Sequence, residues 1–330
     1  MRKFSIIVPT LNRSKYLCRM LESVFEQTLL PYEIIIVDQS NNDETLKVVE
    51  HFNTCAKELG IVFSYLYLSD PGLTRARNIG LEAATGNFVT FLDDDVILDK
   101  KYMEEVSKTI DKHGAIVVQG KITNYHDRFH FYRYLIQKLF MLSSPSEVSS
   151  IVYPSFGNVL PVRFQEDVIC MWASGCNHTI RTDIAREFKY DENLIAYGLG
   201  EDVDITFRIY RQYPRCIWAN PLAKISHYES PGERLTNEKY LYMEAVHRYY
   251  LFYKNGDNSL TSKLSLAWSR IGYLSITTPK ILLSSPKKRF KGVTHLFLAE
   301  LFVLQNVDRV QKLDLAFFHH WFNNKSRANH

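Results

Sequence analysis

FVTFLDDDVI, residues 88–97, places three consecutive carboxylates directly after a short apolar run. Residues 88–92 are typical of a buried strand. Asp93, Asp94 and Asp95 then stand at the edge of the core, where like charges repel one another and lose their hydration. We therefore expect a positive group beside the end of this strand.

Strands and helices alternate on both sides of this stretch. Short β-branched runs predict strands at residues 4–8, 33–37, 61–68 and 88–92. Apolar residues at helical spacing predict helices at residues 12–27, 43–59, 74–84 and 102–113. This alternation favours an α/β fold with a mainly parallel sheet that is flanked by helices on both faces.

Polar residues follow several of these strands, at the sheet edge where ligands bind in such folds. Thr10 and Arg13 follow the first strand, Asp38 ends the second, and the acidic triplet follows the fourth. These side chains are expected to converge on one edge of the sheet. The triplet would then belong to a ligand site.

The later part of the chain is less regular. Strands are predicted at residues 116–122, 171–181 and 216–225, and a helix at residues 200–211. The aromatic-rich segment 126–164 is interpreted as irregular excursions around the rim of a site. Helices are predicted at residues 239–254, 261–276 and 292–310, so we divide the chain into a domain at 1–238 and a helical C-terminal region at 239–330.

Three carboxylates at a strand end suit a hard divalent cation such as Mg²⁺, which shares oxygen ligands with phosphates. Successive side chains of a strand point in opposite directions, so at least one acid has another role, such as binding a ribose hydroxyl. Arg75 and Arg77 precede the triplet and could approach a diphosphate. A solvated acidic turn and ordinary surface arginines are the alternatives.

Two further acids, Glu201 and Asp202, follow Gly198 and Gly200 and open the helix predicted at 200–211. A carboxylate held there can act as a general base towards a hydroxyl. The alternative is an acid cluster that complements the helix dipole.

The composition excludes several classes of protein. A formal net charge of +4 is too small to indicate nucleic-acid binding. Five cysteines without a CxxC pair indicate reduced thiols in a cytoplasmic protein, not a disulfide framework or a zinc site. No secretory leader and no apolar run long enough for a spanning helix is expected.

Three segments together resemble glycosyltransferase family 2, which has the GT-A fold. They are IIVPTLNR at 6–13, residues 74–78 through to FLDDD at 91–95, and GEDVD at 200–204. The resemblance covers about residues 3–230. It implies nucleotide-sugar binding in about 1–125, an acceptor side in about 126–238, and transfer of a sugar with inversion.

The resemblance also implies the reactants and the cofactor. The donor would be a nucleotide-sugar, with UDP as the expected nucleotide, and the cofactor a divalent cation, Mn²⁺ or Mg²⁺. The acceptor would be a glycan or a lipid-linked glycan in the synthesis of a surface polysaccharide or another glycoconjugate.

Residue roles follow from the matching positions. Asp202 matches the catalytic base, with Glu201 as its neighbour in the ED pair, and Asp95 matches the metal ligand of the DxD motif. His227 matches a further metal or diphosphate contact, or is a plain rim histidine. The positions assigned to the nucleotide-sugar are Pro9, Thr10, Arg13, Asp38, Arg77, Asn78, Asp93, Ser174 and Gly175. Asp93 is expected at the ribose, and Asp94 is counted with the nucleotide-sugar group.

Two other functions stay open: a nucleotidyltransferase with a similar sheet and acidic metal site, and a non-catalytic nucleotide-sugar-binding module. Glu201 and Asp202 favour sugar transfer. The C-terminal region holds the basic cluster PKKRFK at 286–291 and the apolar residues Phe317, Phe318, Trp321 and Phe322. It is expected either to contact an anionic membrane at the inner face of the cell, near a lipid-linked acceptor, or to pack as a helical subdomain on the catalytic domain.

Overall fold

The computed structural model describes residues 2–125, 131–146, 149–228, 237–283 and 286–327. A mixed central sheet has the strand order β10-β12-β6-β11-β4-β1-β2-β3, and β5 pairs with β12 beside this path. The strands are β1 (Phe4–Thr10), β2 (Glu33–Asp38), β3 (Val62–Tyr67), β4 (Phe88–Leu92), β5 (Val96–Leu98), β6 (Val117–Ile122), β10 (Val168–Cys170), β11 (Asn177–Arg181) and β12 (Ile217–His227). From β3 to β4 the pairing is parallel, as predicted, whereas β11 runs antiparallel to both β4 and β6.

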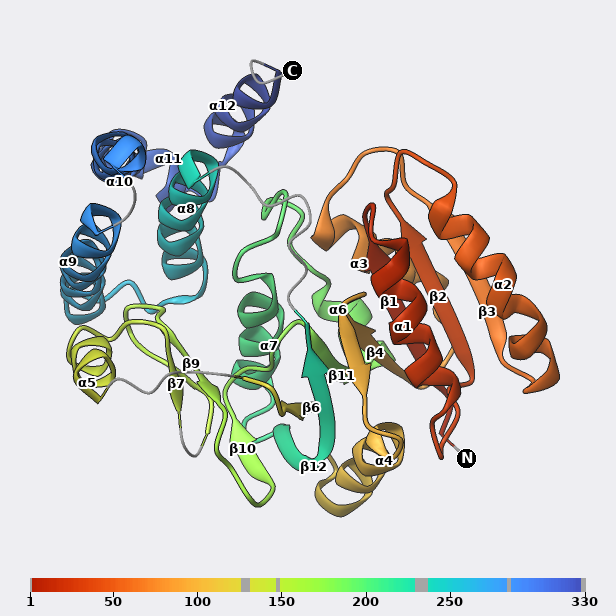
Figure 1. The fold of residues 1–330 in the computed structure, drawn as a ribbon. Coiled ribbons are helices and arrows are strands. Elements are labelled where there is room, and N and C mark those ends of the chain that lie inside the picture. The colour runs from red at the N-terminus through yellow and green to blue at the C-terminus, as the bar shows by residue number, and fades with distance from the viewer. Residues whose placement is uncertain (1, 126–130, 147–148, 229–236, 284–285, 328–330) are drawn as a thin grey trace.

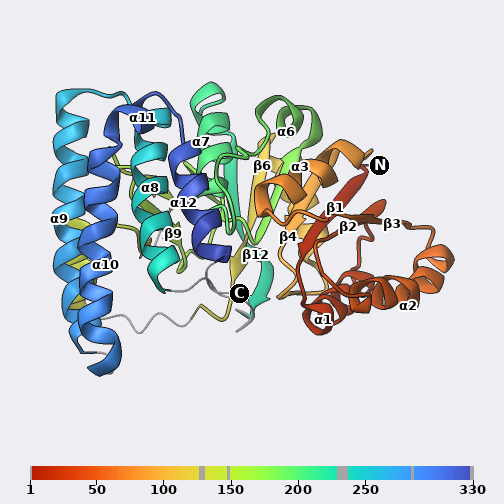
Figure 2. The ribbon, with the colours of Figure 1, turned by 90° about the horizontal axis from the view of Figure 1, so that it is seen from above.

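Helices cover both faces of this sheet (Figures 1 and 2). One apolar core holds the inward residues of α1 (Ser14–Phe25), α2 (Glu44–Glu58) and α4 (Tyr102–His113). A second core, on the other face, holds those of α3 (Leu73–Ala83), α6 (Thr182–Phe188) and α7 (Glu201–Gln212). Every residue of β1, β2 and β4 is buried, because both faces of these strands are covered.

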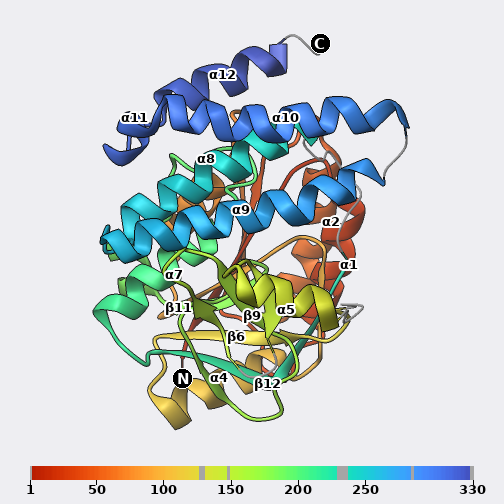
Figure 3. The ribbon, with the colours of Figure 1, turned by 90° about the vertical axis from the view of Figure 1, so that its left-hand side faces the viewer.

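The C-terminal region is helical, as predicted, and forms a layer at one side of the sheet (Figures 1 and 3). Its helices are α8 (Asn237–Asn255), α9 (Leu260–Leu282), α10 (Pro286–Gln305), α11 (Val307–Gln311) and α12 (Ala316–Arg327). A third apolar core joins Phe252 and Phe318 of this region to Trp172 and to Val203 of α7. The division of the chain at residue 238 stays a prediction, since this core contains residues from both sides of it.

The interpretation of 126–164 as irregular is wrong for most of its described residues. They form α5 (Phe131–Leu139) and a small separate sheet of β7 (Ser144–Ser146), β8 (Ile151–Val152) and β9 (Asn158–Pro161). Residues 126–130 and 147–148 lie outside the described part of the chain. Strands this short give too few residues for an alternating pattern to be recognised.

The strand predicted at 171–181 is also wrong in its first half, because β10 ends at Cys170 and β11 begins at Asn177. In the loop between them, three successive backbone N–H groups bond to side chains instead of to a neighbouring strand. Ala173 donates to Thr206 Oγ1 at 3.1 Å, Ser174 to Gln119 Oε1 at 2.7 Å, and Gly175 to Asp202 Oδ2 at 2.8 Å. Backbone donors that are satisfied in this way do not need a strand partner.

Candidate active site

Two paired strands bring the end of the acidic triplet to His227. In the antiparallel pairing of β5 with β12, Val96 lies opposite His227, and the N–H of Tyr228 donates to the Asp95 carbonyl at 2.9 Å. The Nε2 atom of His227 lies 3.0 Å from Asp95 Oδ1. One potential ligand atom each from Asp93, Asp95 and His227 all lie within 4.8 Å of one another.

This cluster fits a divalent cation. Two carboxylates and one imidazole are donors that such cations accept, and Asp95 is almost fully buried. Burial lowers the pKa of His227, but hydrogen bonds to Asp95 and Cys176 outweigh it and raise the pKa to about 11. The protonated ring thus gives Asp95 the positive neighbour that a cation would provide in its place.

Asp94 points to a different partner. Its carboxylate accepts a hydrogen bond from Thr10 Oγ1 at 2.7 Å and one from Arg13 Nη1 at 3.3 Å, so it joins the end of β4 to the end of β1. Burial raises the pKa of Asp94 to about 7, although Arg13 and Thr10 oppose the shift. Arg13 also lies 3.6 Å from Asp95 Oδ2. The positive groups that the triplet required are therefore Arg13 beside Asp94 and Asp95, His227 beside Asp95, and Arg77 beside Asp93.

Asp38 lies at the carboxyl end of β2, beside Thr10 in the parallel register with β1. Its side chain is fully buried, accepting from the Ser40 N–H at 2.9 Å and from the Tyr65 hydroxyl at 2.8 Å. Burial and the neighbouring Asp38 raise the pKa of Tyr65 to about 12, so this hydroxyl stays a donor. Pro9 is buried next to Thr10 at the end of β1. The part of the site that borders Pro9 is therefore rigid.

Arg77 is buried at 1% exposure and connects both sides of the site. Its guanidinium donates to Glu201 Oε1, to Asp93 Oδ1 at 3.0 Å and to the Gly175 carbonyl at 3.0 Å. Burial lowers the pKa of Arg77, but Glu201, Tyr190 and Asp93 outweigh it and raise the pKa. Arg77 thus holds the acidic triplet, the Ser174–Gly175 loop and α7 in one arrangement.

Arg77 lies in α3, and the other two site residues predicted in this helix, Asn78 and Arg75, have different surroundings. The Asn78 amide donates to the Tyr190 carbonyl at 3.0 Å and accepts from the Tyr190 N–H at 2.9 Å, which ties α3 to the segment after α6. Arg75 is exposed and pairs with Asp70 at 2.9 Å. Their assignment to the nucleotide-sugar stays a prediction.

Asp202 lies in the first turn of α7, behind two glycines with left-handed backbone. Gly198 has φ +58° and Gly200 has φ +87°, and a Cβ at Gly200 would lie 2.6 Å from Leu251 Cδ1. The half-buried Asp202 carboxylate accepts the Gly175 N–H, whereas Glu201 is buried against Arg77. Of the two predicted catalytic acids, Asp202 is the one that borders open space.

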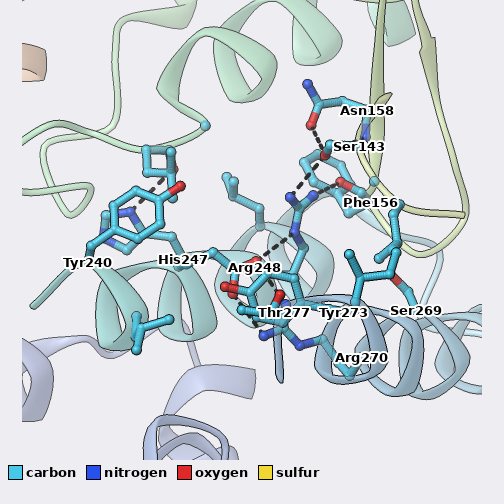
Figure 4. Close-up of a pocket in the computed structure, with 18 of the residues that line it drawn as sticks. Ser143, Phe156, Asn158, Tyr240, His247, Arg248, Ser269, Arg270, Tyr273 and Thr277 are labelled. Atoms are coloured by element: carbon cyan, nitrogen blue, oxygen red, sulfur yellow. Dashed lines mark hydrogen bonds and ion pairs between the residues drawn. The ribbon is translucent and has the colours of Figure 1, made fainter. Parts of the chain in front are cut away.

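That space is a cavity of about 1040 Å³, which is lined by Asp202 and by residues of the C-terminal helices. Figure 4 shows part of its wall. Its wall includes Tyr240, Arg248 and Tyr273, and none of Asp38, Asp93, Asp95 or His227. The Arg248 guanidinium points across the cavity to the Phe156 carbonyl and to Ser143 Oγ, the latter at 3.2 Å. The cavity therefore contains Asp202 but no residue of the cation cluster.

These cavity residues are absent from the sequence-based predictions. Tyr240, Arg248 and Tyr273 lie beyond the three motif segments, and helical spacing alone gives no signal that a side chain faces a cavity. Asp93 was expected at the ribose, whereas the structure also brings it into the cation cluster.

A family model described as glycosyl transferase family 2 matches residues 5–187. The chain belongs to glycosyl transferase family 2. Its curated relatives include the poly(ribitol-phosphate) beta-N-acetylglucosaminyltransferase TarS of Staphylococcus aureus, 33% identical over 130 residues. That match covers 39% of this chain and 22% of TarS, so the chain spans about a fifth of that relative. A second relative is the GalNAc(5)-diNAcBac-PP-undecaprenol beta-1,3-glucosyltransferase of Campylobacter jejuni, 37% identical over 95 residues, which are 29% of this chain and 30% of that relative.

Solved structures of glycosyltransferases share the fold of this family 2 chain. The structure of TarS residues 1–349 with UDP-GlcNAc aligns over 98% of this chain and 88% of its own, with a TM-score of 0.57 and 22% identity. A mannosyltransferase of Pyrobaculum calidifontis with GDP-Man and Mn²⁺ aligns over 92% and 87%, with a TM-score of 0.56 and 15% identity. The predicted GT-A fold is thereby confirmed. In the described part of the chain, no helix combines the length and apolar character needed to cross a bilayer.

Proposed function

We propose that this family 2 chain transfers a sugar from a UDP-linked donor to a hydroxyl of a glycan acceptor, with inversion at the anomeric carbon. One observation carries the proposal: Asp202 borders the large cavity on one side, and Gly175 and Arg77 connect it to the acidic triplet on the other. The names of the relatives and of the aligned structures support a nucleotide-sugar donor, since UDP-GlcNAc and GDP-Man are bound in two of those structures.

The donor would lie along the carboxyl ends of β1, β2 and β4. In this arrangement Asp38 and Pro9 face the nucleotide base and ribose, and Ser174 and Gly175 face the donor sugar. Asp93, Asp95 and His227 would hold Mn²⁺ or Mg²⁺. When bound, such a cation neutralises the negative charge that develops on the departing nucleotide.

Asp202 is proposed as the general base. The acceptor hydroxyl attacks the anomeric carbon on the face opposite to the nucleotide, and its proton passes to an Asp202 oxygen as the new glycosidic bond forms. The bond to the nucleotide phosphate breaks in the same displacement, and the leaving group takes the bonding electrons. A single displacement of this kind inverts the configuration.

The cavity is the proposed acceptor site, because it includes Asp202 and none of the cation cluster. Tyr240 and Tyr273 offer aromatic faces and hydroxyl groups, and Ser143 and Asn158 offer further hydrogen bonds to sugar hydroxyls. Relatives whose names include poly(ribitol-phosphate) and PP-undecaprenol support a glycan or lipid-linked glycan acceptor in surface polysaccharide synthesis. We place this activity in the cytoplasm, at the inner face of the cell membrane.

The substitution Asp202→Asn tests the proposal. Asparagine keeps an oxygen for the Gly175 N–H but cannot take the proton, so turnover should fall by about a thousandfold. The affinity for UDP, measured by calorimetry with Mn²⁺ present, should stay within about twofold because the donor side is untouched. Asp183→Asn, at an exposed carboxylate of α6, is the matched control and should retain full turnover.

Near-normal turnover of Asp202→Asn would exclude Asp202 as the base. The same assay separates the other two functions. Release of pyrophosphate from a nucleoside triphosphate would identify a nucleotidyltransferase. Donor binding without transfer to any acceptor would identify a binding module.

A further inference from the structure

We propose that the outer face formed by α5, α9 and α10 docks on the surface of an anionic lipid bilayer. These three helices lie together at one side of the molecule and face the viewer in Figure 3. More than half of the exposed large apolar side chains among the described residues come from them and from the α9 C-cap. They are Leu135, Ile136, Leu139, Leu260, Leu264, Trp268, Ile271, Leu282, Leu283, Phe297, Leu298, Leu301 and Leu304. Soluble surfaces rarely gather so many in one place without a partner.

Exposed apolar side chains of α9 lie along one side of the helix, in a stripe that is interrupted between Ile271 and Leu282. Leu260, Leu264, Ile271 and Leu282 recur at helical spacing, and Leu260 is 74% exposed. The opposite side of the same helix is buried through Leu266 and its neighbours. The apolar stripe is therefore additional to the stripe that packs α9 onto the protein.

A second stripe runs along α10, with Phe297, Leu298, Leu301 and Leu304 exposed. Leu296, Ala299 and Val303 of this helix are buried in the third core, so α10 also has one apolar side inward and one outward. Both helices therefore carry apolar side chains on the side exposed to solvent as well as on the packed side, which a solvated surface helix does not need.

The layer is held together from within. Arg270 of α9 pairs with Glu244 of α8 at 2.8 Å and also with Glu300 of α10. The Trp268 indole N–H donates to the Leu139 carbonyl at 2.9 Å, which fixes α5 beside α9. These contacts hold α5, α8, α9 and α10 together as one preformed layer.

The charge of this face identifies its partner as an anionic surface. Between residues 258 and 305 the sole acid is Glu300, and its carboxylate is engaged with Arg270. Lys263, Lys280 and Lys291 are exposed in the same segment. The first turn of α10 adds Lys287, Lys288 and Arg289 in sequence, although the side chains of 286–290 lie outside the described residues.

Apolar stripes with a basic rim match anionic lipid headgroups above acyl chains. A second copy of this chain is a poorer partner, because it would bring two basic rims together. Lys280 and Lys291 lie near the junction of α9 and α10, whereas Lys263 lies in the first turn of α9. Lys280, Ile281 and Gly292, at this junction, also line the cavity that begins at Asp202. A docked bilayer would therefore lie beside the far end of the proposed acceptor site; only this last step rests on the proposed function.

Co-sedimentation of the full chain with vesicles tests the docking. Binding is expected to phosphatidylcholine vesicles that contain phosphatidylglycerol, and at least tenfold weaker binding to phosphatidylcholine alone. The double variant Leu264→Gln, Ile271→Gln should lose at least tenfold in binding. Leu59→Gln with Leu222→Gln, at exposed positions elsewhere, should bind as the wild type does.

Neutralising two lysines tests the basic rim. Lys263→Gln with Lys291→Gln should weaken binding to the anionic vesicles roughly 25-fold, and high salt should remove the difference. Lys47→Gln with Lys57→Gln on α2 is the control and should have no effect. UDP affinity should be unchanged in all four variants, so a failure of docking is distinct from a failure of the proposed function.

Two results would overturn the docking proposal. One is the absence of wild-type binding to anionic vesicles. The other is a lipid-free dimer, detected by analytical ultracentrifugation, that Leu264→Gln with Ile271→Gln dissociates, because the face would then belong to a second copy.

Discussion

Arg77 touches both sides of the candidate site. It contacts Asp93 next to the cation cluster and Glu201 next to the proposed base, and it is buried. A buried ion pair adds little stability over an apolar replacement of both partners, but loss of one partner leaves uncompensated buried charge. Removal of Arg77 would therefore leave two carboxylates, those of Asp93 and Glu201, without this positive partner.

Arg77→Met should lower the free energy of unfolding by about 3–5 kcal/mol, as measured by urea denaturation. Arg75→Met on the same helix removes an exposed ion pair and should change that free energy by less than about 1 kcal/mol. Equal losses of unfolding free energy in the two variants would contradict the inference that Arg77 connects the two sides of the site.

At the residue scale, the sequence indicated which side chains lie near one another, but not which of them contact each other. Strand ends predicted that Thr10, Asp38 and the acidic triplet lie at one sheet edge, because parallel strands share that edge. The burial of Arg77 was not predictable, since its contacts with Glu201 and Gly175 join positions about a hundred residues apart. Nor did spacing reveal that Asp94 turns to Thr10 and Arg13.

At the scale of elements, the start of α7 decides where Asp202 lies. The two glycines before the helix, Gly198 and Gly200, both have left-handed backbone. Gly200 additionally has Leu251 of α8 against it, so the helix start and the C-terminal layer are in direct contact. A side chain at this position would displace the turn that carries Asp202.

Gly200→Ala is expected to lower turnover at least tenfold while leaving the UDP affinity unchanged. Gly114→Ala is a matched control, because Gly114 has φ +61° but no atom within 4 Å of its added Cβ. Both variants should lose about 1 kcal/mol of stability to backbone strain, and only Gly200→Ala should lose activity. Full turnover of Gly200→Ala in a steady-state transfer assay would show that this contact does not position the base.

Helices and strands with a strong periodic pattern of apolar residues were predictable from the sequence. Segments whose backbone is held by hydrogen bonds to side chains were not. The first four strands and four helices match the prediction, because apolar patterns record burial against two layers. The loop at 171–176 looked like a strand, yet its N–H groups bond to Thr206, Gln119 and Asp202. The short β5 carries too little pattern to be predicted, although its pairing with β12 creates the cation cluster.

At the scale of the whole molecule, three apolar cores meet around the candidate site. Two cover the sheet, and the third joins α7 to the C-terminal helices. The region beyond the motif segments is thus packed against the helix that carries Asp202. A ligand that binds this assembly and not the unfolded chain will stabilise all of it together.

Mn²⁺ and UDP together should raise the melting temperature by several degrees in scanning fluorimetry. At a hundred times the dissociation constant, binding adds about 2.7 kcal/mol to the unfolding free energy. His227→Ala should lose most of the Mn²⁺-dependent part of this shift, whereas His51→Ala, on the exposed side of α2, should keep it. An undiminished shift in His227→Ala would remove that residue from the cation site.

The pairing of β5 with β12 has a practical consequence for the handling of the protein. Backbone hydrogen bonds, including that from Tyr228 to Asp95, set the spacing of the cluster without any ion. In small zinc domains, by contrast, the fold collapses when the ion is taken away. This chain should therefore survive repeated stripping with a chelator and reloading with a different cation. A single preparation would then allow one cation after another to be compared.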